Sequence, residues 1–258
     1  MSSHSLILKD LSVAFGGNKV LEGVNISFTE GLHGLVGPNG AGKTTCYNAI
    51  SGYVTPTSGT VELDGTNLVG TPSHEIGSKG IGRTFQTPKL VAKMTVLENV
   101  MLGANRTFTT GHVAEFFGTK KARAEERVVR EMAYATLAQF GLDSAARDKA
   151  SSVPLAVQKM VEIARALVTN PVVLLLDEPA AGLGAEDVDR MVEALLKVIK
   201  ERNLTTVIIE HDLHLVSQIC SKLSVLHYGR IIAEGDPKVV VKDEVVIEAY
   251  LGKRKAVK

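Results

Sequence analysis

The sequence predicts an α/β fold with a mainly parallel sheet, and three observations indicate it. A glycine-rich loop, residues 37–45, stands between a short apolar run and a segment with helical character. A second apolar run, residues 172–176, ends directly in the acidic pair Asp177-Glu178. Around both stretches, strand-like segments alternate with segments of helical periodicity, which is the order expected of parallel strands joined by helices.

The loop at residues 37–45 fits G-x-x-x-x-G-K-[ST], the pattern of a phosphate-binding P-loop. Its glycines allow a tight turn with backbone N–H groups facing an anion, and the helix that follows adds its positive end. Lys43 is expected to reach the β- and γ-phosphates, and the Thr44 hydroxyl to bind Mg²⁺. The predicted nucleotide-binding residues of the loop are Gly37, Asn39, Gly40, Ala41, Gly42, Lys43, Thr44 and Thr45.

Length and composition suit an ordinary globular protein. The 258 residues, 45% of them hydrophobic and 22% charged, fit one large domain or two small ones. A formal net charge of +1 gives no general attraction for nucleic acid, so no nucleic-acid partner is expected. Cys46 and Cys220 form no metal or redox spacing, which suits a reducing cytosol, and we expect Cys46 to serve packing. No apolar run is long enough to cross a bilayer, so in a membrane process another chain must provide the membrane part.

Short strands dominate the first third of the predicted secondary structure. Apolar residues alternate along residues 6–15 and 20–28, and Gly16-Gly17-Asn18 between them is a turn signal, so we expect an antiparallel pair. Further strands are expected at residues 32–36, 61–63 and 81–85, and a helix at residues 45–51.

The pattern then becomes helical until about residue 169. Helices are expected at residues 95–102, 120–140 and 157–169. Thr95 and Glu98 have the spacing of a capping box, and Gly141 stands where a helix C-terminus is often capped.

The remaining segment returns to alternating strands and helices. Buried strands are expected at residues 172–176 and 205–209, helices at 185–202 and 213–220, a hairpin around Tyr228-Gly229, and one closing helix at 239–251.

The acidic pair completes a hydrolytic arrangement. A strand that ends in Asp177 places a carboxylate beside the P-loop, where it can hold the Mg²⁺ shell. Glu178 next to it can polarise a water for attack on the γ-phosphate. A P-loop followed by such a pair predicts hydrolysis of a nucleoside triphosphate.

With these motifs in order, the sequence resembles the nucleotide-binding subunits of ATP-binding cassette (ABC) transporters over nearly its whole length. The resemblance implies a RecA-like P-loop NTPase core with an antiparallel β-subdomain, at residues 1–86 and 167–235. It implies an inserted helical subdomain at residues 87–166, and a C-terminal helix and tail at 236–258. The implied reaction is hydrolysis of ATP with Mg²⁺.

The resemblance also assigns residues outside the P-loop. Gln86 is expected to sense Mg²⁺ and the attacking water, and His211 to contact the γ-phosphate and position the water. Phe15 matches the aromatic residue that stacks on adenine, although it could instead be part of the core. The catalytic residues are then Glu178, His211 and Gln86, and the Mg²⁺ site comprises Thr44, Gln86 and Asp177.

Four segments narrow the resemblance to importers of branched-chain amino acids. These are residues 80–86, 94–100, 178–183 and 247–252. Related urea or amide importers and a lipopolysaccharide exporter remain alternatives, as do a soluble ABC ATPase and, less in keeping with the motifs, a P-loop kinase. The implied partners are transmembrane permease subunits, a second ABC ATPase subunit and, indirectly, a substrate-binding protein. The implied location is the cytoplasm, peripheral on the cytoplasmic face of the cell membrane.

One motif departs from the family. The signature segment, normally similar to Leu-Ser-Gly-Gly-Gln, aligns with residues 153–158, where the serine and both glycines are missing. Gly184 stands at the usual aspartate of the D-loop. In the family both motifs face the nucleotide of the partner subunit, so we expect a heterodimer with two unequal sites. Pro154 is expected in the first turn of the helix, with Ser152 as a partial substitute for the cap.

Overall fold

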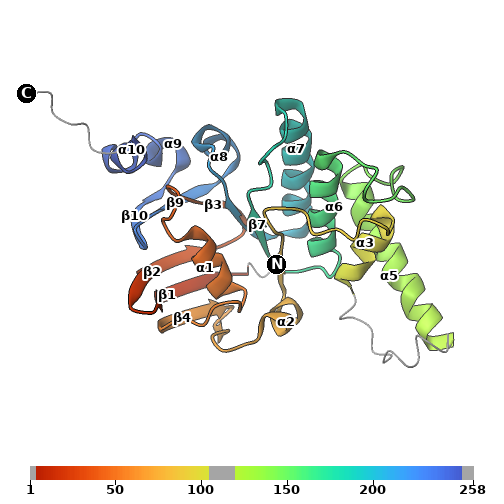
Figure 1. The fold of residues 1–258 in the computed structure, drawn as a ribbon, viewed down its shortest axis with the longest axis horizontal. Helices are drawn as coiled ribbons and strands as arrows, with labels where there is room; N and C mark the ends of the chain where they lie inside the picture. The colour runs from red at the N-terminus through yellow and green to blue at the C-terminus, as the bar shows by residue number, and fades with distance from the viewer. Residues whose placement is uncertain (1–3, 105–119, 252–258) are drawn as a thin grey trace, which may run out of the picture. The chain divides into compact units, whose positions relative to one another are not determined.

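The computed structural model describes residues 4–104 and 120–251, which divide into two compact units (Figure 1). The first unit takes the described residues up to Ile81, Val172–Glu178, and the chain from Ile199 onward. The second takes the described residues of Gly82–Pro171 together with Pro179–Val198. The helical subdomain expected at residues 87–166 stays a prediction, and its residues 105–119 and the predicted tail from residue 252 lie outside the described residues.

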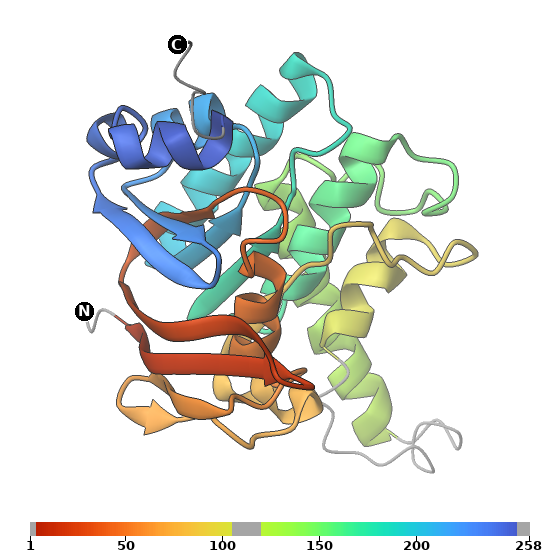
Figure 2. The ribbon, with the colours of Figure 1, turned by 60° about the vertical axis from the view of Figure 1, so that its left-hand side comes forward.

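A four-stranded antiparallel sheet belongs to the first unit, with the order β2-β1-β4-β5 (Figure 2). Its strands are β1 (Leu6–Phe15), β2 (Asn18–Phe28), β4 (Ser58–Leu63) and β5 (Thr66–Asn67). The predicted antiparallel pair is confirmed, since Leu6 lies opposite Phe28 and Phe15 opposite Asn18. Leu6, Leu8, Leu11 and Val13 of β1 are buried, with a shift of register between Leu8 and Leu11.

The second sheet has six strands in the order β10-β9-β3-β8-β7-β6. They are β3 (Gly31–Val36), β6 (Ile81–Arg83), β7 (Val173–Asp177), β8 (Thr205–Ile209), β9 (Lys222–His227) and β10 (Arg230–Gly235). The pairs β3–β8, β3–β9 and β7–β8 are parallel, which confirms the predicted sheet type. The carboxyl ends of β3, β7 and β8 therefore meet at one edge, where ligands bind in open α/β sheets.

The hairpin predicted at Tyr228-Gly229 joins β9 and β10 antiparallel. Both turn residues have positive φ, 44° for Tyr228 and 76° for Gly229, as a type I′ turn requires. The apolar run before the turn, together with the turn signal, was sufficient to predict this hairpin from the sequence.

The helices of the first unit are α1 (Lys43–Ile50), α2 (Ser73–Ile76), a 3₁₀ turn (Gly77–Lys79), α8 (Leu213–Ile219), α9 (Pro237–Val240) and α10 (Glu244–Leu251). The single closing helix expected at residues 239–251 is wrong, because the chain breaks between α9 and α10. Asp243 begins a new helix there, its side chain accepting the Val245 N–H at 2.9 Å. Asp236 caps α9 in the same way, with Pro237 in its first turn.

The second unit contains α3 (Val96–Gly103), α5 (Lys120–Gln139), α6 (Leu155–Leu167) and most of α7 (Ala185–Arg202). The capping box is confirmed: Thr95 Oγ1 accepts the Glu98 N–H at 3.2 Å, and Glu98 Oε2 accepts the Thr95 N–H at 2.7 Å. Gly141 has φ 66°, as predicted for the end of α5. The helix expected at residues 157–169 begins two residues earlier and ends at Leu167.

No helix within residues 4–104 and 120–251 combines the length and the hydropathy that a bilayer crossing requires.

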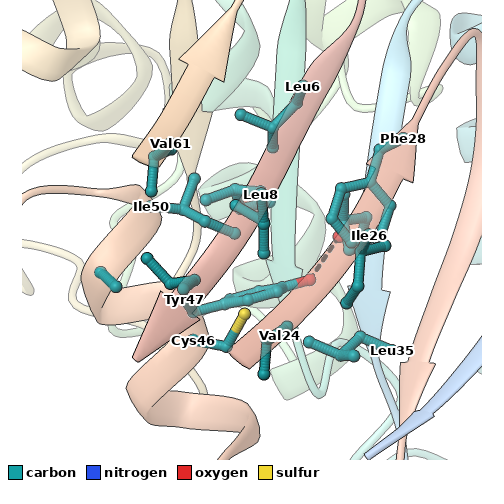
Figure 3. Packing of buried hydrophobic residues seen from close by; sticks show 14 of the residues in the cluster. Leu6, Leu8, Val24, Ile26, Phe28, Leu35, Cys46, Tyr47, Ile50 and Val61 are labelled. Atoms are coloured by element: carbon teal, nitrogen blue, oxygen red, sulfur yellow. Dashed lines mark hydrogen bonds between the residues drawn. The ribbon is translucent and has the colours of Figure 1, made fainter. Parts of the chain in front are cut away.

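The core of the first unit is built around α1, whose inner face packs on the strands (Figure 3). The Tyr47 side chain is fully buried, and its hydroxyl donates to Val207 O at 2.6 Å, with Leu176 O at 3.2 Å. Cys46 beside it is also fully buried, and burial raises the pKa of its thiol to about 12. Cys46 is therefore a packing residue, as predicted.

The Tyr47 hydroxyl yields a stability prediction. Tyr47→Phe keeps the ring but leaves a buried carbonyl without its partner, so the free energy of unfolding should fall by about 1–2 kcal/mol. Urea denaturation measures it. Tyr228→Phe is the matched control, because the Tyr228 side chain is exposed. Equal stability of the two variants would contradict the assigned contribution.

Candidate active site

The P-loop follows β3 and runs directly into α1. Gly42, the N-cap residue of α1, has φ 106°, a left-handed conformation that glycine adopts without strain. In the described part of the chain, no side chain hydrogen-bonds to this end of the helix. The first backbone N–H groups of α1 are thus available to an anion, together with the positive helix end.

Lys43 lies at the centre of this loop and is buried. Its ammonium donates to Gly37 O at 2.6 Å and to Pro38 O at 3.0 Å, so the side chain folds back across the loop. Burial lowers the pKa of Lys43, and the nearby carboxylates of Glu178 and Asp177 oppose that shift. A buried cation held by carbonyls and near two carboxylates is suited to pair with a phosphate.

Asp177 is the last residue of β7, and Glu178 follows it in the same unit. The Asp177 side chain is buried, and Asp177 pairs in register with Ile209 of the neighbouring β8. Glu178 has φ 48°, a left-handed conformation that is rare for a residue with a side chain, and its N–H donates to Ile209 O at 2.9 Å. The two successive carboxylates are therefore fixed by the backbone at the carboxyl edge of the parallel sheet.

His211 follows β8 and meets Glu178. His211 Nε2 forms a hydrogen bond with Glu178 Oε1, and the Glu178 side chain is the more buried of the two. Asp212 begins α8, accepting the N–H groups of His214 at 2.8 Å and Leu215 at 3.0 Å. This cap fixes the backbone directly after His211. The imidazole is therefore positioned by the hydrogen bond to Glu178 and by the capped start of α8. Lys43, Asp177, Glu178 and His211 all come together in the first unit, as the sequence predicts.

The donor set fits the expected Mg²⁺. The Thr44 side chain is exposed at the first turn of α1, and the Asp177 carboxylate is at the end of β7. A hydroxyl and a carboxylate are hard oxygen ligands of the kind Mg²⁺ takes, with phosphate and water completing its shell. Among residues 4–104 and 120–251, no three His, Cys, Asp or Glu gather as a metal site of their own.

Phe15 stands at the end of β1, beside the hairpin turn, and 51% of it is exposed. The structure thus rules out a core role for this ring. An exposed aromatic face is what stacking on a base requires, and the stacking itself stays a prediction.

Gln86, the signature segment and Gly184 belong to the second unit. Gln86 follows β6 in the second unit, whereas Lys43, Asp177, Glu178 and His211 belong to the first. Pro154 is the N-cap of α6 rather than a first-turn residue, and in the described chain no side chain caps that end. The cap expected of Ser152 is wrong, because its hydroxyl donates to Lys149 O at 2.8 Å.

Sequence reasoning missed three contacts that support the P-loop, two from the β9–β10 hairpin and one from α10. Gly229, in the β9–β10 turn, donates its N–H to Ala41 O at 3.0 Å. A Cβ on Gly37 would lie 2.0 Å from Leu226 O, so the loop packs backbone to backbone on β9. Tyr250 of α10 places a buried hydroxyl near the Gly37 N–H; burial raises the pKa of Tyr250 to about 12, and Gly37 opposes that shift. The hairpin signal could have indicated the first contact, but nothing in the sequence placed α10.

Comparison with known proteins identifies relatives of this arrangement. Residues 21–181 match the family model described as ABC transporter. Residues 230–256 match the model described as branched-chain amino acid ATP-binding cassette transporter. The chain is 38% identical to the high-affinity branched-chain amino acid transport ATP-binding protein BraF of Pseudomonas aeruginosa, covering 98% of this chain and 99% of that protein. It is 36% identical, with the same coverage, to the corresponding protein LivG of Escherichia coli K12.

Solved structures show the same fold. The ADP conformation of an ATP-binding cassette of an ABC transporter has a TM-score of 0.84 at 33% identity, covering 97% of this chain and 99% of that one. A dimeric cassette in a post-hydrolysis state, bound to ADP and phosphate, has a TM-score of 0.74 at 25% identity, covering 90% of this chain and 98% of that one.

The position of Lys43 yields a binding prediction. Lys43→Ala removes the cation while leaving the backbone N–H groups, so the Kd for ATP should rise by about tenfold or more, the value of one charge-assisted hydrogen bond. Titration of the purified protein with a fluorescent ATP analogue measures it. Lys200→Ala, at an exposed position on α7, is the control. An unchanged Kd for Lys43→Ala would remove Lys43 from the site.

Proposed function

Because this chain belongs to the ATP-binding subunits of ABC transporters, we propose that its ATPase activity powers the import of branched-chain amino acids. The observation that supports this substrate class is the match of the C-terminal segment, residues 230–256, to a model described by that substrate. The curated relatives BraF and LivG match over nearly the whole chain, which supports the same proposal.

The reaction is ATP + H₂O → ADP + phosphate, and its catalysis rests on position and charge. In the proposal, the P-loop N–H groups and Lys43 hold the phosphates, and Phe15 stacks on adenine. Thr44, Asp177 and Gln86 would hold Mg²⁺, which supplies charge neutralisation on the β- and γ-phosphates when bound.

Glu178 is the proposed base that polarises the attacking water, and His211 is the proposed residue that orients it. The hydrogen bond between His211 Nε2 and Glu178 Oε1 supports this pairing, because it places both groups at one point of the sheet edge. Gln86 is the third proposed catalytic residue.

The remaining assignments concern the assembly. As an ATP-binding subunit of a transporter, the chain works with transmembrane subunits and pairs with a second ATPase. We assign it to the cytoplasm, peripheral on the cytoplasmic face of the membrane, where permease subunits contact the helical subdomain of residues 87–166. A substrate-binding protein would act indirectly, through the permease.

The altered signature supports pairing with a different ATPase. Pro154 offers neither a hydroxyl nor an N–H, and Leu155 and Ala156 add side chains where the usual glycines permit close backbone approach. The uncapped helix end remains and attracts an anion by about 1 kcal/mol. The partner's ATP would then be held but hydrolysed slowly, while this chain's own site is the active one.

The substrate proposal is tested by transport. Proteoliposomes containing this chain, its partner ATPase, the permease pair and the binding protein, with ATP on the side of the ATPases, should accumulate labelled leucine and not labelled urea. Non-hydrolysable ATP serves as the control and should abolish uptake. Accumulation of urea without leucine would assign the chain to an amide importer instead.

The proposed asymmetry is tested by changing one catalytic glutamate at a time in that complex. Glu178→Gln keeps the shape but loses the base, so ATP should still bind while turnover falls by about 100-fold, within the range of general-base catalysis. The matching change in the partner should lower turnover by less than about threefold, because the site opposite residues 153–158 contributes little. Phosphate release measures both.

Two results would refute the unequal sites. One is an equal loss of turnover from the two glutamine variants. The other is robust ATPase activity by a homodimer of this chain alone.

A further inference from the structure

The segment that carries Gln86 is attached to α6 on both sides of that residue. On one side, the Phe85 N–H donates to Glu162 Oε1 at 3.2 Å. On the other, Arg165 Nη1 donates to Lys89 O at 2.6 Å. Glu162 and Arg165 lie one turn apart on α6 and are themselves paired, with Arg165 Nη2 at 3.2 Å from Glu162 Oε1.

Burial makes this pair unlike an ordinary surface ion pair. Glu162 is 2% exposed, and burial raises the pKa of its carboxyl, while Arg165 and the N–H groups of Phe85 and Lys89 lower it. Loss of one of these partners would leave the buried carboxylate incompletely hydrogen-bonded, at a cost in free energy. The pair therefore specifies a single position for residues 85–89 relative to α6.

The same short segment is closed on itself. Lys89 Nζ lies 4.3 Å from the centroid of the Phe85 ring, and the Arg83 guanidinium lies 5.5 Å from it. These distances are within the range of cation–π attraction. Arg83 and Lys89, on either side of Gln86, are therefore both held against the Phe85 ring, so we expect residues 83–89 to move together.

The turn of α6 that carries Arg165 is packed without space for adjustment. A Cβ added to Gly103 of α3 would lie 2.1 Å from Arg165 O, and one added to Gly82 of β6 would lie 2.6 Å from Ala166 O. Both neighbours approach the helix backbone directly. A displacement of α6 is therefore passed to the chain on either side of it.

We propose that Glu162 and Arg165 are positioning residues for Gln86: they fix the backbone on both sides of Gln86 to α6, so the orientation of Gln86 follows that helix. The proposal rests on the function proposed above for Gln86. It links α6, which Pro154 of the altered signature precedes as N-cap, to the residue proposed to sense Mg²⁺ and water, through two side chains within the second unit.

The test uses conservative variants in the reconstituted complex. Glu162→Gln removes the charge at constant shape, and Arg165→Lys keeps the charge but lacks the fork that reaches both Lys89 O and Glu162. Each should lower kcat by about tenfold, leave KM for ATP within about twofold, and raise the Mg²⁺ concentration for half-maximal turnover. Arg127→Lys is the control, because Arg127 pairs with Glu131 on the exposed face of α5.

A double-mutant cycle separates positioning from general structure. In a Gln86→Ala background, Glu162→Gln should cause no further loss of kcat, because the residue it positions is already absent. Hydrogen exchange of the peptide containing residues 83–91 should be faster in Glu162→Gln and unchanged in Arg127→Lys.

The outcomes distinguish the two proposals. Additive losses in the cycle, or unchanged exchange of that peptide in Glu162→Gln, would overturn the positioning role. Full turnover by Gln86→Ala would instead overturn the role of Gln86 itself.

Discussion

The P-loop must present backbone N–H groups to an anion, and the elements around it in the first unit keep that arrangement fixed. Backbone N–H groups that are kept for a ligand do not stabilise the free loop, so neighbouring elements must supply much of its stability. Here β9 contacts the Gly37 backbone, the β9–β10 turn binds Ala41 O, and the Tyr47 hydroxyl anchors α1 to β7 and β8. The loop is thus preorganised before any nucleotide binds, which is the condition for electrostatic catalysis.

The same sheet edge explains why few residues suffice for the chemistry. Parallel strands end together, so Asp177 at the end of β7, Glu178 directly after it and His211 two residues beyond β8 reach the same edge of the sheet. The buried ammonium of Lys43 and the two carboxylates compensate one another's charges in the free protein. A bound phosphate changes that balance, because it offers the lysine a stronger partner than the Gly37 and Pro38 carbonyls.

Local signals were sufficient to predict most of the fold. The capping box at Thr95, the turn at Tyr228-Gly229 and the fully buried strands β7 and β8 could each be predicted from a few neighbouring residues. The break before Asp243 was missed because residues 239–251 have an apolar spacing that suits one helix or two. The Glu162–Arg165 attachment was missed because it joins residues far apart in the chain, and a Glu and an Arg one turn apart on a helix are commonplace. Gln86 and Phe15 were located by resemblance, and periodicity alone would not have distinguished them.

The backbone of Glu178 has a consequence for how this position tolerates change. A left-handed conformation costs a residue with a side chain about 1–2 kcal/mol, a cost that glycine avoids. Glycine at this position would therefore make the free protein more robust while removing the proposed base. Laboratory selection for thermal stability alone should therefore favour glycine at position 178. Selection for growth that depends on transport should retain glutamate there.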